Sequence, residues 1–142
     1  MPQDTRLARL LHVLLHMHLH GGATTSATIA QMLQTNPVVV RRTMAGLRDA
    51  GYVVSNGGRA GGWSLGQHFD RLTVADVYRV ISTSRPFAFG PATDNPECPV
   101  ESAANSFLVG SMATTENFLL AQFSSKKLLD LVQDIPSQQK SK

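Results

Sequence analysis

Cysteine is nearly absent from this chain: its 142 residues contain one, Cys98. A single cysteine excludes a disulfide within the chain and agrees with a reducing compartment. No apolar run approaches the ~20 residues that a membrane span needs, and no charged start followed by an apolar run marks a secretory signal. We therefore expect a cytoplasmic protein without a membrane partner.

The signatures of common enzymes are also missing. The chain contains no Gly-x-Ser-x-Gly elbow, no His-Glu-x-x-His pair and no evident pair of catalytic acids. The glycine run at 57–62 lacks both the Lys-Ser/Thr ending of a phosphate-binding loop and the spacing of a dinucleotide fingerprint. The sequence thus predicts a protein that is not an enzyme.

Positive charge is unevenly distributed, although the net charge is only +3. Residues 1–85 contain all nine arginines and four aspartates, whereas residues 86–142 contain four lysines and six acids. Arginine is well suited to bidentate contacts with phosphate and guanine. The first part of the chain is therefore a candidate for binding nucleic acid, with an affinity that falls steeply as salt increases.

Residues 25–65 show the pattern of a winged helix-turn-helix. A short helix begins at Thr25 or Ser26, either of which can cap its free N–H groups. After a short turn, Asn36 caps a second helix and Pro37 takes its first position, where a missing N–H costs nothing. Gly51 ends that second helix as a left-handed cap.

The second helix has a core-facing side and a distinctive outer side. Its residues Val40, Met44 and Leu47 recur at the spacing of one helix face and should face the core. The outer side carries valines and arginines, namely Val38, Val39, Arg41, Arg42, Ala45 and Arg48. In helix-turn-helix proteins this helix enters the major groove, where arginine reaches phosphates or guanine edges and valine contacts thymine methyls. The alternative is a solvated helix whose arginines merely aid solubility.

A β-hairpin is predicted from residues 52–54 and 63–65, with a glycine-rich tip that carries Arg59. Glycines lack a Cβ, so such a tip can lie close to a nucleic-acid backbone, although an ordinary flexible hairpin has the same composition. We predict that Arg59 contacts the DNA backbone or the minor groove. Ser26 and Thr28 are predicted to touch phosphates from the preceding helix.

The rest of the chain supplies a framework. We predict a first helix over 6–19, a helix that starts with a capping box at Thr73 and Asp76, a loop over 84–96, a long helix over 99–123, and a last helix over 126–135. The fold class is mainly α with a small β-hairpin. The expected divisions are a winged helix-turn-helix domain at 1–83, a loop at 84–98, dimerisation helices at 99–135 and a mobile tail at 136–142.

The long helix is predicted to pair with a second copy of the chain. Its apolar stripe comprises Val100, Ala103, Ala104, Phe107, Leu108, Met112, Thr115, Phe118, Leu119 and Phe123. The preceding globule is too small to cover a stripe that runs for roughly 36 Å at about 1.5 Å per residue. A helix of this length can set two recognition helices about one DNA turn, ~34 Å, apart. The alternative is a helix buried within one domain.

Taken together, these stretches resemble the Rrf2 family of bacterial transcriptional regulators, over about 6–135. The resemblance is carried by residues 25–27, 36–42, 47–51, 61–65 and 72–81. It implies a homodimer that binds a near-palindromic DNA operator as a repressor or activator, and we expect a repressor. It also implies a sensory segment just before the long dimerisation helix.

The chain departs from the family pattern in two places. Many members carry three cysteines in the sensory segment and bind an iron–sulfur cluster, whereas this chain has only Cys98, so we expect no such cluster. The position of the family's wing arginine is occupied by Gly57, and Arg59 follows two residues later. The family's recognition-helix contacts transfer more directly, to Val38, Val39, Arg41 and Arg42.

Cys98 and a row of histidines are further candidate sites. Cys98 is predicted near the start of the long helix, as a redox sensor that oxidises or pairs with the Cys98 of a second copy, or as an inert residue. His12, His16 and His20 lie on one helix face, where they can bind a transition metal or form a polar surface. The main functional alternative to operator binding is a winged-helix module that binds protein through the same surface.

Overall fold

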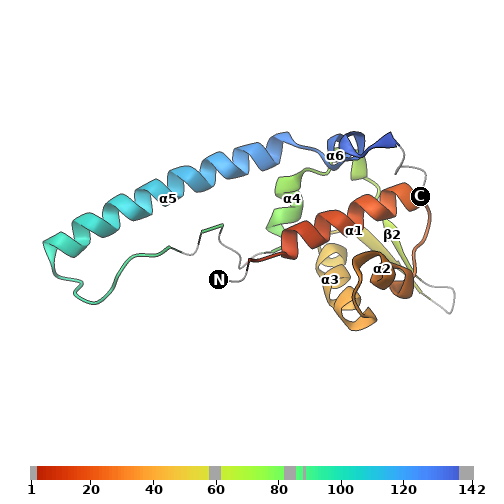
Figure 1. The fold of residues 1–142 in the computed structure, drawn as a ribbon, viewed down its shortest axis with the longest axis horizontal. Coiled ribbons are helices and arrows are strands. Elements are labelled where there is room, and N and C mark those ends of the chain that lie inside the picture. Colours follow the sequence, from red (N-terminus) through yellow and green to blue (C-terminus); the bar gives the residue numbers. More distant parts are fainter. Residues whose placement is uncertain (1–2, 58–61, 82–85, 88, 138–142) are drawn as a thin grey trace.

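A computed structural model describes residues 3–57, 62–81, 86–87 and 89–137 of the chain (Figure 1). The predicted hairpin tip with Arg59, and most of the predicted mobile tail, lie outside these residues. The elements are α1 Arg6–His20, α2 Ser26–Leu33, α3 Pro37–Asp49, β1 Val53–Asn56, β2 Gly62–Leu65, the 3-10 helix η1 Phe69–Arg71, α4 Val74–Arg79, α5 Pro99–Ser125 and α6 Leu128–Asp134. The predicted fold class, mainly α with one small hairpin, is confirmed.

The helix-turn-helix is bounded by the capping residues that the sequence indicates. Thr25 Oγ1 accepts a hydrogen bond of 3.1 Å from the Thr28 N–H at the start of α2. Asn36 Oδ1 accepts one of 3.1 Å from the Val39 N–H, with Pro37 in the first turn of α3. Gly51 follows α3 with a φ of +83°, in the left-handed region that favours glycine. Both helices therefore begin at their predicted caps, and α3 ends at the predicted glycine.

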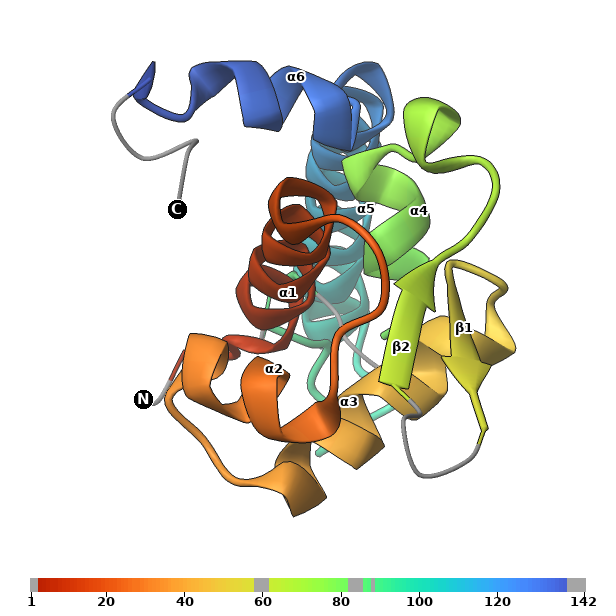
Figure 2. The same cartoon turned by 90° about the vertical axis from the view of Figure 1, so that its right-hand side faces the viewer.

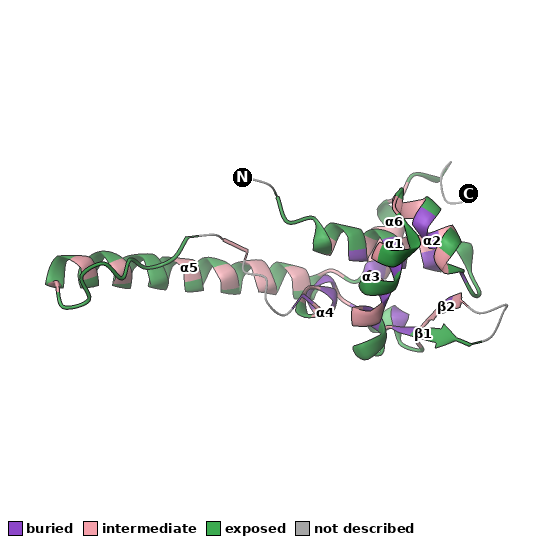
Figure 3. Cartoon of the chain, turned by 90° about the horizontal axis from the view of Figure 1, so that it is seen from below, coloured by how far each residue is buried: buried purple, intermediate pink, exposed green. Residues whose placement is uncertain are grey.

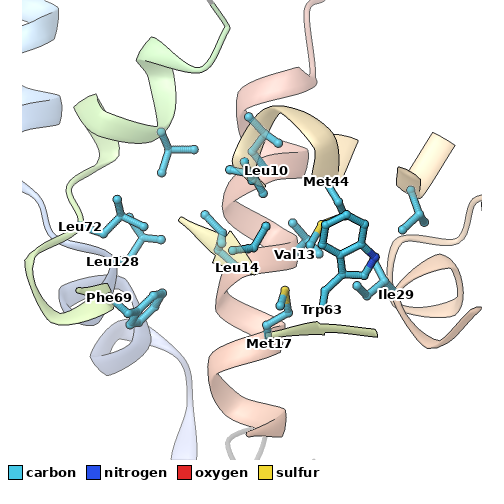
Figure 4. Close-up of a cluster of buried hydrophobic side chains, with 14 of the residues drawn as sticks. Leu10, Val13, Leu14, Met17, Ile29, Met44, Trp63, Phe69, Leu72 and Leu128 are labelled. Atoms are coloured by element: carbon cyan, nitrogen blue, oxygen red, sulfur yellow. The ribbon is translucent and has the colours of Figure 1, made fainter. Parts of the chain in front are cut away.

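The hydrophobic core is centred on α1, with the helix-turn-helix on one side and α6 on the other (Figure 2). Figure 4 shows α1 side chains in contact with residues from most other elements of the globule. The fully or nearly fully buried members include Val13, Leu14, Met17, Ile29, Val40, Met44, Leu47, Val53, Val77 and Leu128. Burial of these side chains holds α3 in a fixed position on α1.

The hairpin is attached to the helices through the α1–α2 connection. β1 and β2 pair antiparallel, with Val53 opposite Leu65. The Thr24 N–H donates to the Trp63 carbonyl at 2.8 Å, and the Trp63 N–H donates to the Thr24 carbonyl at 2.7 Å. The segment before α2 thus pairs with β2 like a short third strand, which fixes the base of the wing relative to α2.

Helix α6 packs into the same core, although the sequence-based division placed residues 126–135 with the dimerisation helices. The Leu128 side chain is fully buried, and its N–H donates to the Leu72 carbonyl at 2.9 Å. The Val74 N–H donates in turn to the Lys126 carbonyl at 2.9 Å. These long-range backbone bonds join the start of α6 to the start of α4, so α6 is part of the globule.

Helix α5 projects away from the globule (Figures 1 and 3). It has 27 residues, none of which is buried, and spans about 40 Å. Its C-terminal end is fixed by Phe123, whose ring lies edge-on to that of Tyr78 at a centroid distance of 5.7 Å. Among the described helices, none combines the length and the apolar character that crossing a membrane requires.

The segment before α5 runs back along that helix and is tied to it. Asn105 binds the backbone of Ala92 twice: its Oδ1 accepts from the Ala92 N–H at 2.9 Å and its Nδ2 donates to the Ala92 carbonyl at 2.8 Å. The Asn95 N–H donates to Glu101 Oε2 at 2.9 Å. Cys98 is the N-cap residue of α5, at the point where the segment joins the helix.

Candidate nucleic-acid interface

The outer side of α3 is a cationic surface with one prominent apolar residue. Arg41, Arg42 and Arg48 are exposed, and the Val38 side chain is 61 % exposed. Arg48 lies 3.6 Å from Asp49, whereas within the described residues no ion pair engages Arg41 or Arg42. These two guanidinium groups are therefore available for an external anion.

The two N-terminal valines of α3 differ in their surroundings, although both were predicted to face away from the core. Val38 faces solvent, but Val39 is half-buried and lines a cavity of about 440 Å³ between α1, α3 and the end of α4. Arg42 lies at the same cavity. Val39 is covered because the N-terminal half of α1 lies beside this flank of α3 (Figure 1).

Two predicted phosphate contacts on α2 already have partners within the molecule. Ser26 Oγ accepts a hydrogen bond of 3.1 Å from the indole N–H of Trp63 on β2. Thr28 Oγ1 lies 2.9 Å from Thr25 Oγ1, in the cap of α2. Both side chains are half-buried. The Ser26 hydroxyl holds α2 against the wing, and because it accepts from Trp63 its own O–H remains free to donate to a phosphate.

The described part of the wing is polar at its outer edge. Asn56 Nδ2 donates to Ser64 Oγ at 2.7 Å, between the two strands.

In the views of Figures 1 and 2, α2 and α3 lie on the side of the globule opposite α6. The structure therefore presents α2 and α3 together on one side, and Arg59 is outside the described residues.

Cys98 lies at the far end of α5 from the globule (Figure 1). The residue is half-buried, its N–H donates to the Asn95 carbonyl at 3.0 Å and its carbonyl accepts from the Ser102 N–H at 3.0 Å. Its thiol makes no capping hydrogen bond. A chemical change at Cys98 is thus remote from α3 of the same chain.

Two members of the histidine row lie next to each other. The rings of His12 and His16 have centroids 4.7 Å apart. Burial lowers the pKa of His16, and the nearby charge of His12 lowers it further. In the described portion of the chain, no three His, Cys, Asp or Glu side chains form a group that can hold a metal ion.

Two arginines that line the cavity beside α3 were not among the predicted site residues. Arg6 and Arg9, in the first turns of α1, line the same cavity as Arg42. The two arginines are three positions apart, so they fall on one face of that helix. Asp4 forms an ion pair with Arg6 at 2.8 Å, and its hydrogen bond raises the pKa of Arg6.

Comparison with known proteins agrees with this architecture. The Rrf2 family model, described as an iron-dependent transcriptional regulator, matches residues 3–134. YwnA of Bacillus subtilis (strain 168), named as an HTH-type transcriptional regulator, is 29% identical over 129 residues, which cover 91% of this chain and 96% of YwnA.

Two solved structures share the fold. T. potens IscR has a TM-score of 0.71 at 20% identity and covers 98% of this chain and 91% of its own. CymR (YrzC), the global cysteine regulator of B. subtilis, has a TM-score of 0.65 at 22% identity and covers 96% of this chain and 99% of its own.

The helix-turn-helix, the hairpin beside it and the cationic α3 define a DNA-binding transcription regulator rather than an enzyme. The family match extends over nearly the whole chain, including the projecting helix. The chain belongs to the Rrf2 family of transcriptional regulators.

The residues present do not fit the iron centre that the family description implies. An iron–sulfur cluster is held mainly by several cysteine thiolates, and the only cysteine of this chain is Cys98. His12 and His16 supply two adjacent imidazoles, but no third ligand joins them within the described residues. Any signal that this protein senses must therefore act through other groups.

Proposed function

We propose that this protein is a homodimeric, sequence-specific repressor that binds a near-palindromic DNA operator. The observation that carries the proposal is the outer side of α3. There Arg41 and Arg42, which form no ion pair among the described residues, and the exposed Val38 stand on a helix whose other side is buried. A rigid helix with such a surface suits the major groove.

Each predicted contact has a role in this proposal. Arg41 and Arg42 contact phosphates or base edges, Arg48 contacts the backbone and Val38 contacts base methyls. Val39 contacts a base methyl only with the part of its side chain that α1 leaves exposed. Ser26 and Thr28 contact phosphates from α2, and Arg59 reaches the backbone or minor groove from the wing. Operator binding also agrees with the expected cytoplasmic location.

We expect a repressor because occupation of the operator by the protein is by itself sufficient to block transcription. A dimer that covers an operator overlapping a promoter excludes the polymerase without any further contact, whereas activation requires a surface that recruits the polymerase. Run-off transcription from a promoter that contains the selected operator tests this point. We expect the transcript to decrease as protein is added, and an increase would show an activator.

The DNA-binding proposal is tested by selecting genomic fragments with the purified full-length protein and measuring the affinity by fluorescence anisotropy. Changing Arg41 or Arg42 to alanine should weaken binding by about 1–3 kcal/mol and reduce the steep salt dependence. Arg71→Ala is the matched control, because Arg71 is the exposed last residue of η1 and lies near Ala50 and Gly51, past the C-terminal end of α3 and not on its outer side. A module that binds protein through the same surface predicts neither DNA binding nor a salt slope.

We further propose that the operator affinity responds to oxidation of Cys98. Support comes from its position, since this half-buried thiol is at the junction between the segment tied to α5 and α5 itself. Two Cys98 thiols, one from each copy, would lose two protons and two electrons to an oxidant such as hydrogen peroxide and form one disulfide. Operator affinity should then change with peroxide in the native protein and stay constant in Cys98→Ser.

A further inference from the structure

The cavity beside α3 combines positive charge with an apolar floor. Arg6, Arg9 and Arg42 stand around it, whereas the buried side chains of Leu10 and Ile81 and the half-buried Val39 form its interior. Its volume of about 440 Å³ lies within the range of small-molecule sites in proteins. Among the described residues that line it, none is acidic.

The charges at this cavity are only partly neutralised. Asp4 engages Arg6 through two Nε contacts at 3.0 and 3.2 Å and one Nη2 contact at 2.8 Å. No ion pair of the described residues involves Arg9 or Arg42. Two guanidinium groups, one from α1 and one from α3, are therefore left to share an anion, which each can bind with a paired set of donors.

An anion alone does not account for the shape of this site. A DNA phosphate would meet the exposed arginines but would leave the apolar interior empty, because neither the phosphate nor the deoxyribose supplies an aliphatic chain to fill it. A carboxylate with a short hydrocarbon tail satisfies both parts, since its charge meets Arg9 and Arg42 and its tail covers Leu10, Val39 and Ile81.

We propose that this cavity binds a small organic carboxylate with a short apolar tail, and that the bound ligand weakens DNA binding because it engages Arg42. The inference rests on the proposed function, in which Arg42 contacts DNA. One guanidinium cannot serve both partners fully, so ligand and operator weaken each other by the same factor. The site supplies a signal input that needs neither iron nor cysteine.

Binding to the cavity is tested without DNA, by two-dimensional NMR of the isotope-labelled full-length protein. The probe is hexanoate, compared with acetate, hexanamide and inorganic phosphate. We expect saturable shifts of the Leu10, Val39 and Ile81 signals with hexanoate, at a Kd of about 1 mM. Hexanoate should bind about tenfold more tightly than each of the other three.

Arg9→Gln isolates the ligand site, because Arg9 lies on α1 and is not among the proposed DNA contacts. It should weaken hexanoate binding about tenfold and leave operator affinity without hexanoate unchanged. In the native protein, saturating hexanoate should reduce operator affinity at least about fivefold, within the usual range of coupling between sites. Arg71→Gln is the control and should alter neither measurement.

Four results would overturn the inference. The first is no saturable shift with hexanoate. The second is that phosphate binds as tightly as hexanoate. The third is that Arg9→Gln loses operator affinity. Either of these two results would indicate that the arginines contact the DNA backbone instead. The fourth is operator affinity that hexanoate leaves unchanged or increases. If the protein bound no DNA at all, the NMR titration would still report on the cavity, so failure of the proposed function is separable from failure of this site.

Discussion

The close packing of β2 against the segment before α2 depends on Gly62. A Cβ at this position would lie 2.7 Å from the Thr24 carbonyl oxygen and 2.9 Å from its carbon, which are backbone atoms that cannot rotate away. Gly62→Ala must therefore push β2 from the segment before α2 and weaken the paired bonds between Thr24 and Trp63. We expect a loss of about 1–3 kcal/mol in the free energy of unfolding, measured by urea denaturation.

Gly57→Ala is the matched control for this prediction. Among the described residues, nothing lies within 4 Å of a Cβ built at Gly57, which directly follows Asn56, the residue paired with Gly62. The free energy of unfolding of Gly57→Ala should therefore stay close to that of the native protein. An equal loss in both variants would show that the close approach of Gly62 to Thr24 does not limit stability.

His16 makes the stability of α1 dependent on pH. Its pKa is lowered in the folded protein by burial and by the charge of His12, so the unfolded chain binds a proton more readily than the folded one. The contribution of His16 to the free energy of unfolding is complete above the pKa of a histidine in the unfolded chain, about 6.5. It decreases as the pH falls from there towards the pKa of His16 in the folded protein.

The thermal midpoint should therefore fall between about pH 7.5 and pH 5.5, and this fall should be smaller in His16→Gln. His20→Gln is the control, since His20 is exposed at the end of the same helix. Identical pH profiles for the native protein and His16→Gln would contradict the assignment. Differential scanning calorimetry at both pH values provides the measurement.

At the scale of elements, the recognition helix depends on its N-cap. Asn36 Oδ1 accepts from the Val39 N–H, which has no partner within the helix. Asn36→Ala removes this acceptor and should lower the free energy of unfolding by about 1 kcal/mol. Asn36→Asp retains an acceptor and should preserve stability within a few tenths of a kcal/mol. Similar losses in both variants would show that the cap hydrogen bond is unimportant.

The helix-turn-helix was predictable because its boundaries are local. Thr25, Asn36, Pro37 and Gly51 each specify a start or an end through their own backbone and side-chain chemistry, and the structure places all four in those roles. The capping box of α4, made by Thr73 and Asp76, was predictable for the same reason.

Contacts between distant segments could not be predicted in this way. The apolar residues of α6 have helical spacing, but that spacing does not say that Leu128 packs beside Leu72 rather than on a second chain. Likewise, the half-burial of Val39 depends on where the N-terminal half of α1 lies. The candidate cavity beside α3 arises from the same long-range packing and was therefore absent from the sequence-based site.

At the scale of the whole molecule, α5 has two different sides. One is contacted by the segment before it, through Asn105 and Glu101, and this segment also lies against Val109 and Met112. The other side is not covered by any described residue: Val100, Phe107 and Phe118 are 78 %, 71 % and 65 % exposed. These three residues are seven and eleven positions apart and so fall on one face of an α-helix. Exposed aromatic residues in such a row are typical of a surface that associates.

The uncovered side of α5 predicts a dimer, and acidic side chains introduced on that side should dissociate it. In the doubly substituted protein Phe107→Glu, Phe118→Glu, association would bury two carboxylates on each copy without partners, so the protein should become monomeric in sedimentation equilibrium. Phe89→Glu is the matched control, because Phe89 is 74 % exposed but lies on the segment before α5, against the other side of that helix. That control should remain dimeric. The monomeric variant should also lose most of its operator affinity, because two half-sites are then no longer bound as one unit. A native protein that sediments as a monomer would contradict this prediction, as would a double variant that stays dimeric.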